Sequence, residues 1–235
     1  MGYHDTVLNF RIGVRYAAGA ALTILLAAIA WPWAGLLLWP ALSLAIVAAA
    51  YFGLGPGIYR KHGGRLPVST RWLLAPTLVG QYLSLCHYRR QCRPWDEAVP
   101  GVLIGRTLSE SEAVELVRRG VTAVLDLTAE FSEPAPLRAI TYRNIPILDL
   151  TAPTMPQLRE AVEFIRDQTA AGGTVYVHCK VGYSRTATVV GAYLMASGRC
   201  QSLDDALLRL RTVRPRIVIR PEAINALKAF QLQPR

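Results

Sequence analysis

The chain has 235 residues, of which 52% are hydrophobic and 18% charged, and its formal net charge is +10. An ordinary soluble domain carries about 25% charged residues, so this composition excludes extensive disorder and indicates that part of the chain lies in lipid. The basic excess suits nucleic acid, an anionic membrane surface or an anionic substrate. Four cysteines without a Cys-x-x-Cys pair predict neither a disulfide framework nor a zinc site, and Cys86, His87 and Cys92 lack a fourth ligand, so no metal is expected.

The first feature in chain order is an uncharged run of 44 residues, from residue 16 to residue 59. As one helix it would be about 66 Å long, whereas a bilayer core is about 30 Å thick. The run is broken at Trp31-Pro32-Trp33-Ala34-Gly35, where proline and glycine loosen a helix and tryptophan favours the membrane interface. We therefore expect a membrane anchor over residues 1–60, an α-helical hairpin whose two transmembrane helices cover residues 14–30 and 36–52.

Basic residues flank both ends of this hairpin: Arg11 and Arg15 before it, and Arg60, Lys61, Arg65 and Arg71 after it. The turn between the helices is uncharged, so the positive-inside rule places both ends in the cytoplasm. We expect a multi-pass protein of a bacterial inner membrane whose downstream domain is cytoplasmic. Two other interpretations stay open: a signal peptide with its cleavage site at Ala28-Ile29-Ala30, and a pair of buried helices in a soluble core.

Residues 61–94 form a basic segment next to the predicted anchor. Within it, residues 72–88 are apolar but contain Pro76 and Gln81, which suits an interfacial helix on the cytoplasmic leaflet better than a third span. A third span would move the downstream domain across the membrane. The arginines that follow, Arg89, Arg90 and Arg93, favour the cytoplasm.

From residue 95 to residue 235 the composition is that of a soluble domain. Short β-rich runs predict strands at residues 102–104, 122–127, 140–147 and 174–177. Helices are predicted at residues 109–119, 155–170, 185–196, 202–213 and 221–230, the first beginning with a capping box at Ser109 and Glu112. Strands that alternate with helices predict an α/β domain, with a central, mostly parallel sheet flanked by helices.

The chemistry is concentrated at residues 175–186, where an apolar strand leads through a tight loop into a helix. Backbone N–H groups of such a loop bind a phosphate dianion, and Gly182 permits the geometry that the loop needs. Arg185 can hold two phosphate oxygens in a fork. The same positive field lowers the pKa of the Cys179 thiol, whose thiolate can attack phosphorus and form a phosphocysteine. The predicted phosphate-binding residues are Lys180, Val181, Gly182, Tyr183, Ser184 and Arg185.

The string His178-Cys179-x-x-Gly182-x-Ser184-Arg185-Thr186 resembles the cysteine-dependent phosphatases, specifically the dual-specificity branch of the protein tyrosine phosphatase superfamily. The resemblance covers residues 95–230 and implies the dual-specificity phosphatase fold and a reaction that needs no cofactor. It also implies that the Thr186 hydroxyl helps the thiolate leave in the second step. His178 would orient the loop as a supporting residue rather than act as a base.

The leaving oxygen needs a proton, so a carboxylic acid should face the loop. In the family this aspartate lies about thirty residues upstream of the cysteine. Asp149 has that spacing and follows a predicted strand, and it is our candidate for the general acid. Asp126 is the competitor, but it lies within the preceding strand and suits a structural role.

Substrate class is suggested by a closer resemblance. Residues 149–154, the phosphate loop and Ile219-Arg220-Pro221 look like the mitochondrial phosphatidylglycerophosphate phosphatase group, whose substrate is a lipid phosphate. The loop differs from that group at Val181 and Tyr183, where small or basic residues are common. We expect a membrane-anchored phosphatase of phosphotyrosine, phosphoserine and phosphothreonine; the alternative is a lipid-phosphate phosphatase.

A different class of function is a catalytically silent phosphate-binding module, although such a module would be expected to lose the nucleophile, the arginine or the acid. The expected partners are a phosphorylated protein or phospholipid and the bilayer. Nucleic acid is not expected, because the arginines are dispersed and no nucleic-acid motif is present.

Overall fold

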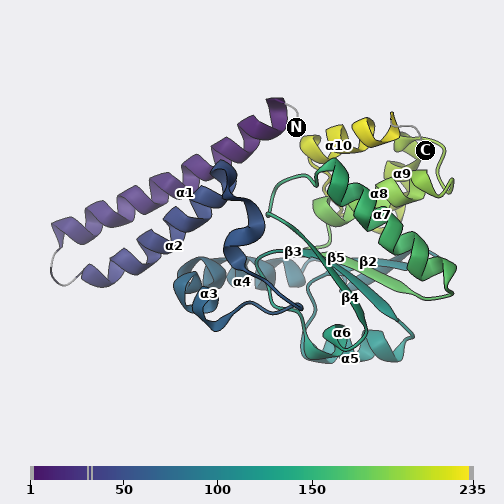
Figure 1. The fold of residues 1–235 in the computed structure, drawn as a ribbon, viewed down its shortest axis with the longest axis horizontal. Helices are drawn as coiled ribbons and strands as arrows, with labels where there is room; N and C mark the ends of the chain where they lie inside the picture. The colour runs from purple at the N-terminus through teal and green to yellow at the C-terminus, as the bar shows by residue number, and fades with distance from the viewer. Residues whose placement is uncertain (1–2, 31, 33, 233–235) are drawn as a thin grey trace. The chain divides into compact units, whose positions relative to one another are not determined.

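The structure is a computed structural model that describes residues 3–30, 32 and 34–232. It forms two compact units (Figure 1). The first comprises the chain up to Cys86 together with Ala129–Ser132, and the second comprises His87–Thr128 and Glu133–Arg235.

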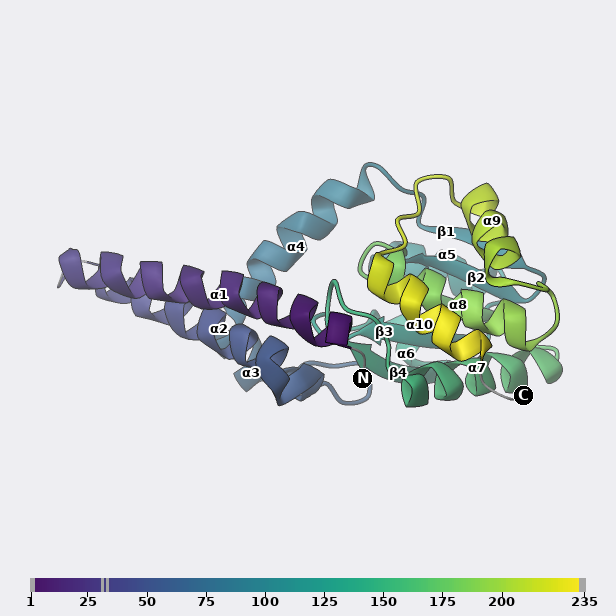
Figure 2. The same cartoon turned by 90° about the horizontal axis from the view of Figure 1, so that it is seen from above.

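A helical hairpin dominates the first unit. Its elements are α1 (Tyr3–Ile29), η1 (Gly35–Leu37), α2 (Leu38–Ala49), η2 (Ala50–Leu54) and η3 (Gly55–Tyr59). Helices α1 and α2 run side by side in Figures 1 and 2, and the rings of Tyr16 and Tyr51 stack with their centroids 5.6 Å apart. The expected hairpin is therefore present; α1 begins earlier than predicted, and α2 is shorter than the predicted second helix. Of the predicted break, Trp31 and Trp33 lie outside the described residues.

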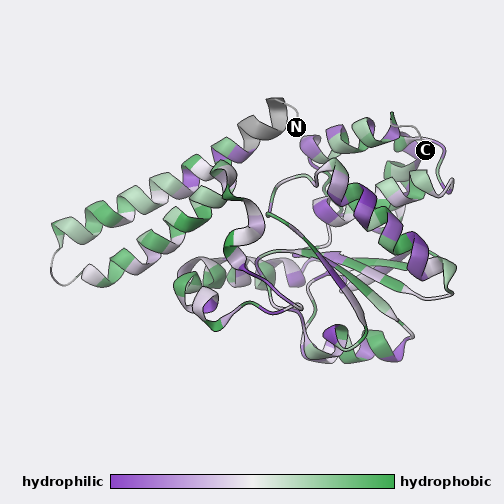
Figure 3. Cartoon of the chain, viewed as in Figure 1, coloured by the Kyte–Doolittle hydropathy of each residue, from purple (hydrophilic) through white to green (hydrophobic). Residues whose placement is uncertain are grey.

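The surface of the hairpin is apolar. Two helical stretches, Asn9–Ile29 and Gly35–Tyr59, are long and apolar enough to cross a bilayer, by length and composition. Only 22% and 33% of their most apolar windows are buried, whereas the core helices of a soluble protein bury most of their residues. In Figure 3, where the ribbon is coloured by residue hydropathy, hydrophobic residues predominate along both arms.

The segment expected as one interfacial helix consists of parts of two helices, α3 (Val68–Leu73) and α4 (Ala75–Arg89). Both contact the hairpin through polar groups. The Trp39 indole N–H donates to the Trp72 carbonyl at 3.0 Å, and the hydroxyls of Ser43 and Thr77 are 2.8 Å apart. Polar contacts thus join α3 and the first half of α4 to the hairpin.

The second unit contains a five-stranded sheet: β1 (Trp95–Val99), β2 (Val102–Arg106), β3 (Ala123–Thr128), β4 (Thr141–Ile147) and β5 (Val175–Cys179). The strand order is β1-β2-β5-β3-β4. Only β1 is antiparallel to its neighbour, and all other pairs are parallel. The predicted, mostly parallel α/β sheet is confirmed, with β1 as an edge strand that was not predicted.

Helices cover both faces of this sheet (Figure 1). They are α5 (Glu110–Arg118), α6 (Ala135–Arg138), α7 (Met155–Ala170), α8 (Ser184–Ala196), α9 (Leu203–Val213) and α10 (Pro221–Gln231). The capping box predicted at Ser109 and Glu112 is formed, and Thr154 with Gln157 makes a second one at α7. The short helix α6 was not predicted.

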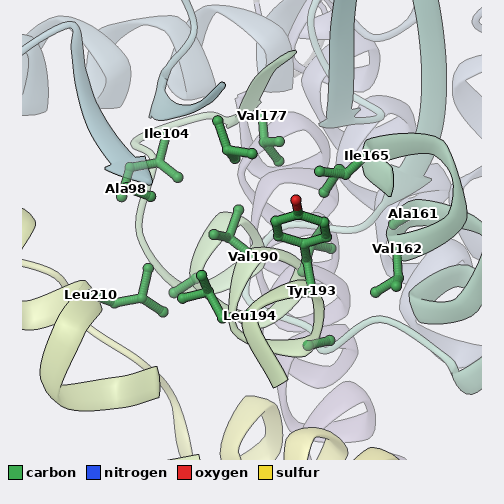
Figure 4. Close-up of a cluster of buried hydrophobic side chains, with 14 of the residues drawn as sticks. Ala98, Ile104, Ala161, Val162, Ile165, Val177, Val190, Tyr193, Leu194 and Leu210 are labelled. Atoms are coloured by element: carbon green, nitrogen blue, oxygen red, sulfur yellow. The ribbon is translucent and has the colours of Figure 1, made fainter. Parts of the chain in front are cut away.

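The larger core lies between the sheet and α8. Val190, Tyr193 and Leu194 of α8 meet Ile104 and Val177 of the sheet (Figure 4). Fully burying such a side chain stabilises the fold by about 1.5–3 kcal/mol. Because α8 is buried from Arg185 to Met195, its first turn is fixed against the carboxyl end of β5. That rigid junction is where the predicted chemistry lies.

Candidate active site

The predicted phosphate loop joins β5 to α8. Cys179 is the last residue of β5, and α8 begins at Ser184. Gly182 has a φ of +73°, and a Cβ atom there would lie 2.3 Å from the carbonyl oxygen of Gly105 on β2. Glycine is therefore needed at this position for both its conformation and its size.

The Cys179 side chain is buried at the base of this loop. Burial alone raises the pKa of its thiol, but the Arg185 charge and hydrogen bonds from the Thr186 hydroxyl and from the N–H groups of Thr186 and Gly182 lower it by more. The net pKa is below that of an ordinary cysteine. The site can therefore hold a thiolate, the nucleophilic form.

The buried guanidinium of Arg185 is fastened to the ends of two neighbouring strands. Its Nη1 donates to the carbonyl of Ile147 on β4 at 2.8 Å and to that of Leu127 on β3 at 3.4 Å, and Nη2 lies 3.0 Å from Asp149 Oδ1. These contacts point the fork of Arg185 at the carboxyl end of the sheet. Parallel strands place their functional loops at this edge.

Asp149 lies two residues after the end of β4 and reaches the phosphate loop. Its Oδ2 is 3.3 Å from Lys180 Nζ, and its Oδ1 accepts from the N–H of Leu150 at 3.0 Å. Burial raises the pKa of this carboxyl, but Arg185 and Lys180 lower it by more, so the net shift is downwards. Leu150 has a φ of +63°, a backbone conformation that costs a non-glycine residue energy and is often found at functional sites.

Asp126, the competing candidate, lies elsewhere. Its fully buried carboxylate accepts hydrogen bonds from the Thr128 N–H at 2.8 Å and from the Tyr142 hydroxyl at 2.6 Å. The structure thus brings Asp149, and not Asp126, to Arg185.

His178 is fully buried behind the loop. Its Nε2 is 3.1 Å from Glu133 Oε2 and 3.8 Å from Asp126 Oδ1, and its ring stacks on Tyr176 with centroids 5.2 Å apart. Among the described residues, Asp126, Glu133 and His178 form a group whose ligand atoms lie within 4.8 Å of one another. The hydrogen bonds that Asp126 already accepts favour a buried polar cluster over a metal site. Sequence reasoning missed Glu133, because nothing in its local pattern links it to the loop 45 residues later.

Residues outside the phosphate loop contact its remaining members. The Val181 carbonyl accepts from Arg214 Nη2 at 3.2 Å, and the Ser184 hydroxyl oxygen accepts from the N–H of Arg220 at 3.3 Å. The Tyr183 ring lies edge-on to Tyr88, with centroids 6.5 Å apart. Tyr88 and Arg214 were not predicted, since each is far from the loop in sequence.

A buried low-pKa thiol, a fork-shaped arginine and a carboxyl group around one strand–loop–helix turn define a cysteine-dependent phosphatase site. The family model that matches residues 105–233 is the dual specificity phosphatase catalytic domain. The chain belongs to this family, and it is a phosphoric monoester hydrolase with the dual-specificity phosphatase fold.

Individual relatives include both lipid and protein phosphatases. The human phosphatidylglycerophosphatase and protein-tyrosine phosphatase 1 is 31% identical over 69% of this chain and 86% of its own length. The human protein phosphatase Slingshot homolog 3 is 34% identical over 56% of this chain, which spans only 20% of that protein. The solved structure of PTPMT1 in complex with PI(5)P is 28% identical, with a TM-score of 0.54, over 59% of this chain and 95% of that one.

Proposed function

We propose that the chain hydrolyses phosphate monoesters through a phosphocysteine on Cys179. The observation that carries this proposal is the convergence of Cys179, Arg185 and Asp149 around the β5–α8 turn. The loop N–H groups and the Arg185 fork bind the phosphate. The Cys179 thiolate attacks phosphorus, an S–P bond forms, the P–O bond breaks, and Asp149 gives its proton to the leaving oxygen.

The second step regenerates the enzyme. Water attacks the phosphocysteine, Asp149 takes a proton from that water, and the S–P bond breaks to release inorganic phosphate. The buried Thr186 hydroxyl, which helps to lower the pKa of the Cys179 thiol, stabilises the departing thiolate. His178 serves as a supporting residue that fixes the end of β5.

The proposed substrate is a phospholipid that carries a phosphomonoester headgroup. The similarity to the human phosphatidylglycerophosphatase and protein-tyrosine phosphatase 1 supports this class, because that name includes a lipid phosphatase and the similarity extends over 86% of that protein, whereas the Slingshot similarity extends over only 20%. The apolar hairpin supports it as well, since an enzyme tethered to a bilayer meets lipid substrates directly.

The proposed organisation is a membrane anchor over residues 1–60, an interfacial segment over residues 61–94 and a catalytic domain over residues 95–235. Exposed apolar side chains on α3 and α4, among them Trp72, Val79 and Leu83, continue the apolar surface of the hairpin. The proposed location is a bacterial inner membrane. The catalytic domain is proposed to face the cytoplasm, because basic residues follow the hairpin at Arg60, Lys61 and Arg65.

Phosphoproteins are the second candidate substrate, favoured by the Slingshot similarity. The test compares phosphatidylglycerophosphate with phosphotyrosine and phosphothreonine peptides, using full-length protein in detergent. We expect kcat/KM for the lipid to exceed that for either peptide by at least about tenfold, a difference of about 1.4 kcal/mol. A preference for a peptide would select the second candidate.

The control for the reaction itself is Cys179→Ser. It should remove turnover of every substrate while leaving phosphate binding measurable. Appreciable residual turnover would contradict the phosphocysteine mechanism.

A further inference from the structure

Asp149 lies between two cations of the site. Lys180 Nζ is 3.3 Å from one carboxylate oxygen, and Arg185 Nη2 is 3.0 Å from the other. Both cationic side chains are buried, with exposed fractions of 7% and 3%. Buried charge pairs at such distances interact strongly, because little water screens them.

This arrangement is unsuited to the first chemical step. A general acid must carry a proton, yet a carboxylate between two cations is held in its charged form. Arg185 must also grip phosphate with both arms of its fork, yet Nη2 is bound to Asp149. An incoming phosphate dianion resolves both conflicts, since it competes with Asp149 for the same two cations.

We propose that Lys180 is a positioning residue that, with Arg185, holds Asp149 ionised until the substrate phosphate takes both cations and releases the carboxyl group to become the proton donor. This inference rests on the proposed role of Asp149 as the acid. Arg185 Nη2 and Lys180 Nζ turn to phosphate oxygens, and Asp149 takes a proton from solvent beside the anionic ester. That proton then moves to the leaving oxygen as the S–P bond forms and the P–O bond breaks.

Three groups that contact Asp149 come from different places. Lys180 comes from the phosphate loop, Arg185 from the first turn of α8, and the Leu150 N–H from the loop of Asp149 itself. Arg185 is needed to bind phosphate, so Lys180 is the cation whose removal tests the proposal while the phosphate-binding fork stays in place.

The experiment measures kcat/KM against pH for full-length enzyme in detergent with an alkyl phosphate, whose poor leaving group requires the acid. Removing the positive charge raises the pKa of Asp149, so the protonated acid persists to higher pH. Lys180→Met should therefore shift the alkaline limb of the kcat/KM–pH profile to higher pH by about one unit. Lys180→Arg, the matched control, should leave the limb in place. Lys180→Gln replaces the methionine variant if that variant does not fold.

Two further measurements separate the possible outcomes. Asp149→Asn should remove the alkaline limb of the profile. The rate of Cys179 alkylation, measured against pH, gives the pKa of the thiol independently. If the limb disappears in Asp149→Asn but coincides with wild type in Lys180→Met, the role of Lys180 is wrong and the proposed function stands. If Asp149→Asn retains the limb, Asp149 is not the acid, and both assignments fail.

Discussion

Gly182 cannot be replaced by a larger residue without moving the phosphate loop. Its φ of +73° is accessible to other residues at a cost of about 1–2 kcal/mol, but its contact with β2 is harder to relieve. A Cβ atom would lie 2.3 Å from the Gly105 carbonyl oxygen and 3.0 Å from the Arg106 nitrogen. Both are backbone atoms of a central strand, so the loop would have to move instead.

We therefore expect Gly182→Ala to lower kcat/KM for a small aryl phosphate by about 100-fold or more, the scale of loss that follows a displacement of about 1 Å at a catalytic group. Gly198→Ala is the matched control. Gly198 has a similar φ of +71°, but a Cβ atom there would meet nothing within 4 Å. It should lower the melting temperature slightly and leave kcat/KM unchanged. If both variants lost activity equally, the loss would be due to the positive φ of the glycine and not to the contact with β2.

The sequence predicted the site best for those residues that lie together in one short segment. Cys179, Gly182 and Arg185 lie within seven consecutive residues, so a strand–loop–helix turn determines their geometry. The spacing implied by the family resemblance also selected Asp149, which the structure brings to Arg185. The contact of Glu133 with His178 depends on how distant segments pack across the sheet, and no local pattern encodes that.

At the scale of elements, a buried arginine from the end of α9 ties three segments together. Arg214 pairs with Asp96 of β1 through Nη1 at 2.7 Å, while Nη2 donates to the Arg93 carbonyl at 3.0 Å and to the Val181 carbonyl at 3.2 Å. Its guanidinium also lies over the Tyr183 ring. The phosphate loop is thus held by β1 and by the residues that precede it, as well as by α8.

Arg214→Lys should loosen this attachment while keeping a positive charge beside Asp96, because an ammonium group cannot match the guanidinium fork. Loss of a buried hydrogen bond costs about 1–3 kcal/mol, so we expect kcat/KM to fall by about tenfold and the inhibition constant of inorganic phosphate to rise in parallel. Arg216→Lys is the control, since exposed Arg216 donates to the Gln91 carbonyl at 3.0 Å. A lower melting temperature with unchanged phosphate inhibition would limit Arg214 to a structural role.

Helices and strands were predictable where the segment was long and its hydrophobic pattern was clear. Helix α7 has the predicted bounds, because a capping box fixes its start and an amphipathic repeat extends it. Strand β1 was missed since Asp96 and Glu97 give it an unusual strand composition. Asp96 is tolerated there because Arg214 neutralises it, a tertiary contact that sequence periodicity does not reveal. The break between α3 and α4 was missed although Pro76 lies beside it, in the first turn of α4, a position that suits proline.

For the whole molecule, the net charge of +10 is unevenly distributed. Up to Trp95 the chain has nine basic residues and one acidic residue, whereas from Asp96 onwards it has 17 basic and 15 acidic residues. The excess therefore lies beside the apolar hairpin and not across the catalytic domain. Such an asymmetry controls orientation in a membrane, because basic flanks remain in the cytoplasm, and it gives no support to nucleic-acid binding.

The orientation can be tested with reporters in a bacterial host. A fluorescent protein fused after Arg235 should mature and fluoresce, since both ends of the hairpin are proposed to be cytoplasmic, and alkaline phosphatase at the same position should be inactive. Alkaline phosphatase inserted after Ala34, in the uncharged turn, should be active. An active alkaline phosphatase after Arg235 would mean that α3 and α4 cross the bilayer or that the hairpin is inverted. Replacing Arg60, Lys61 and Arg65 by glutamine distinguishes these cases, because only an orientation set by these charges should then become mixed.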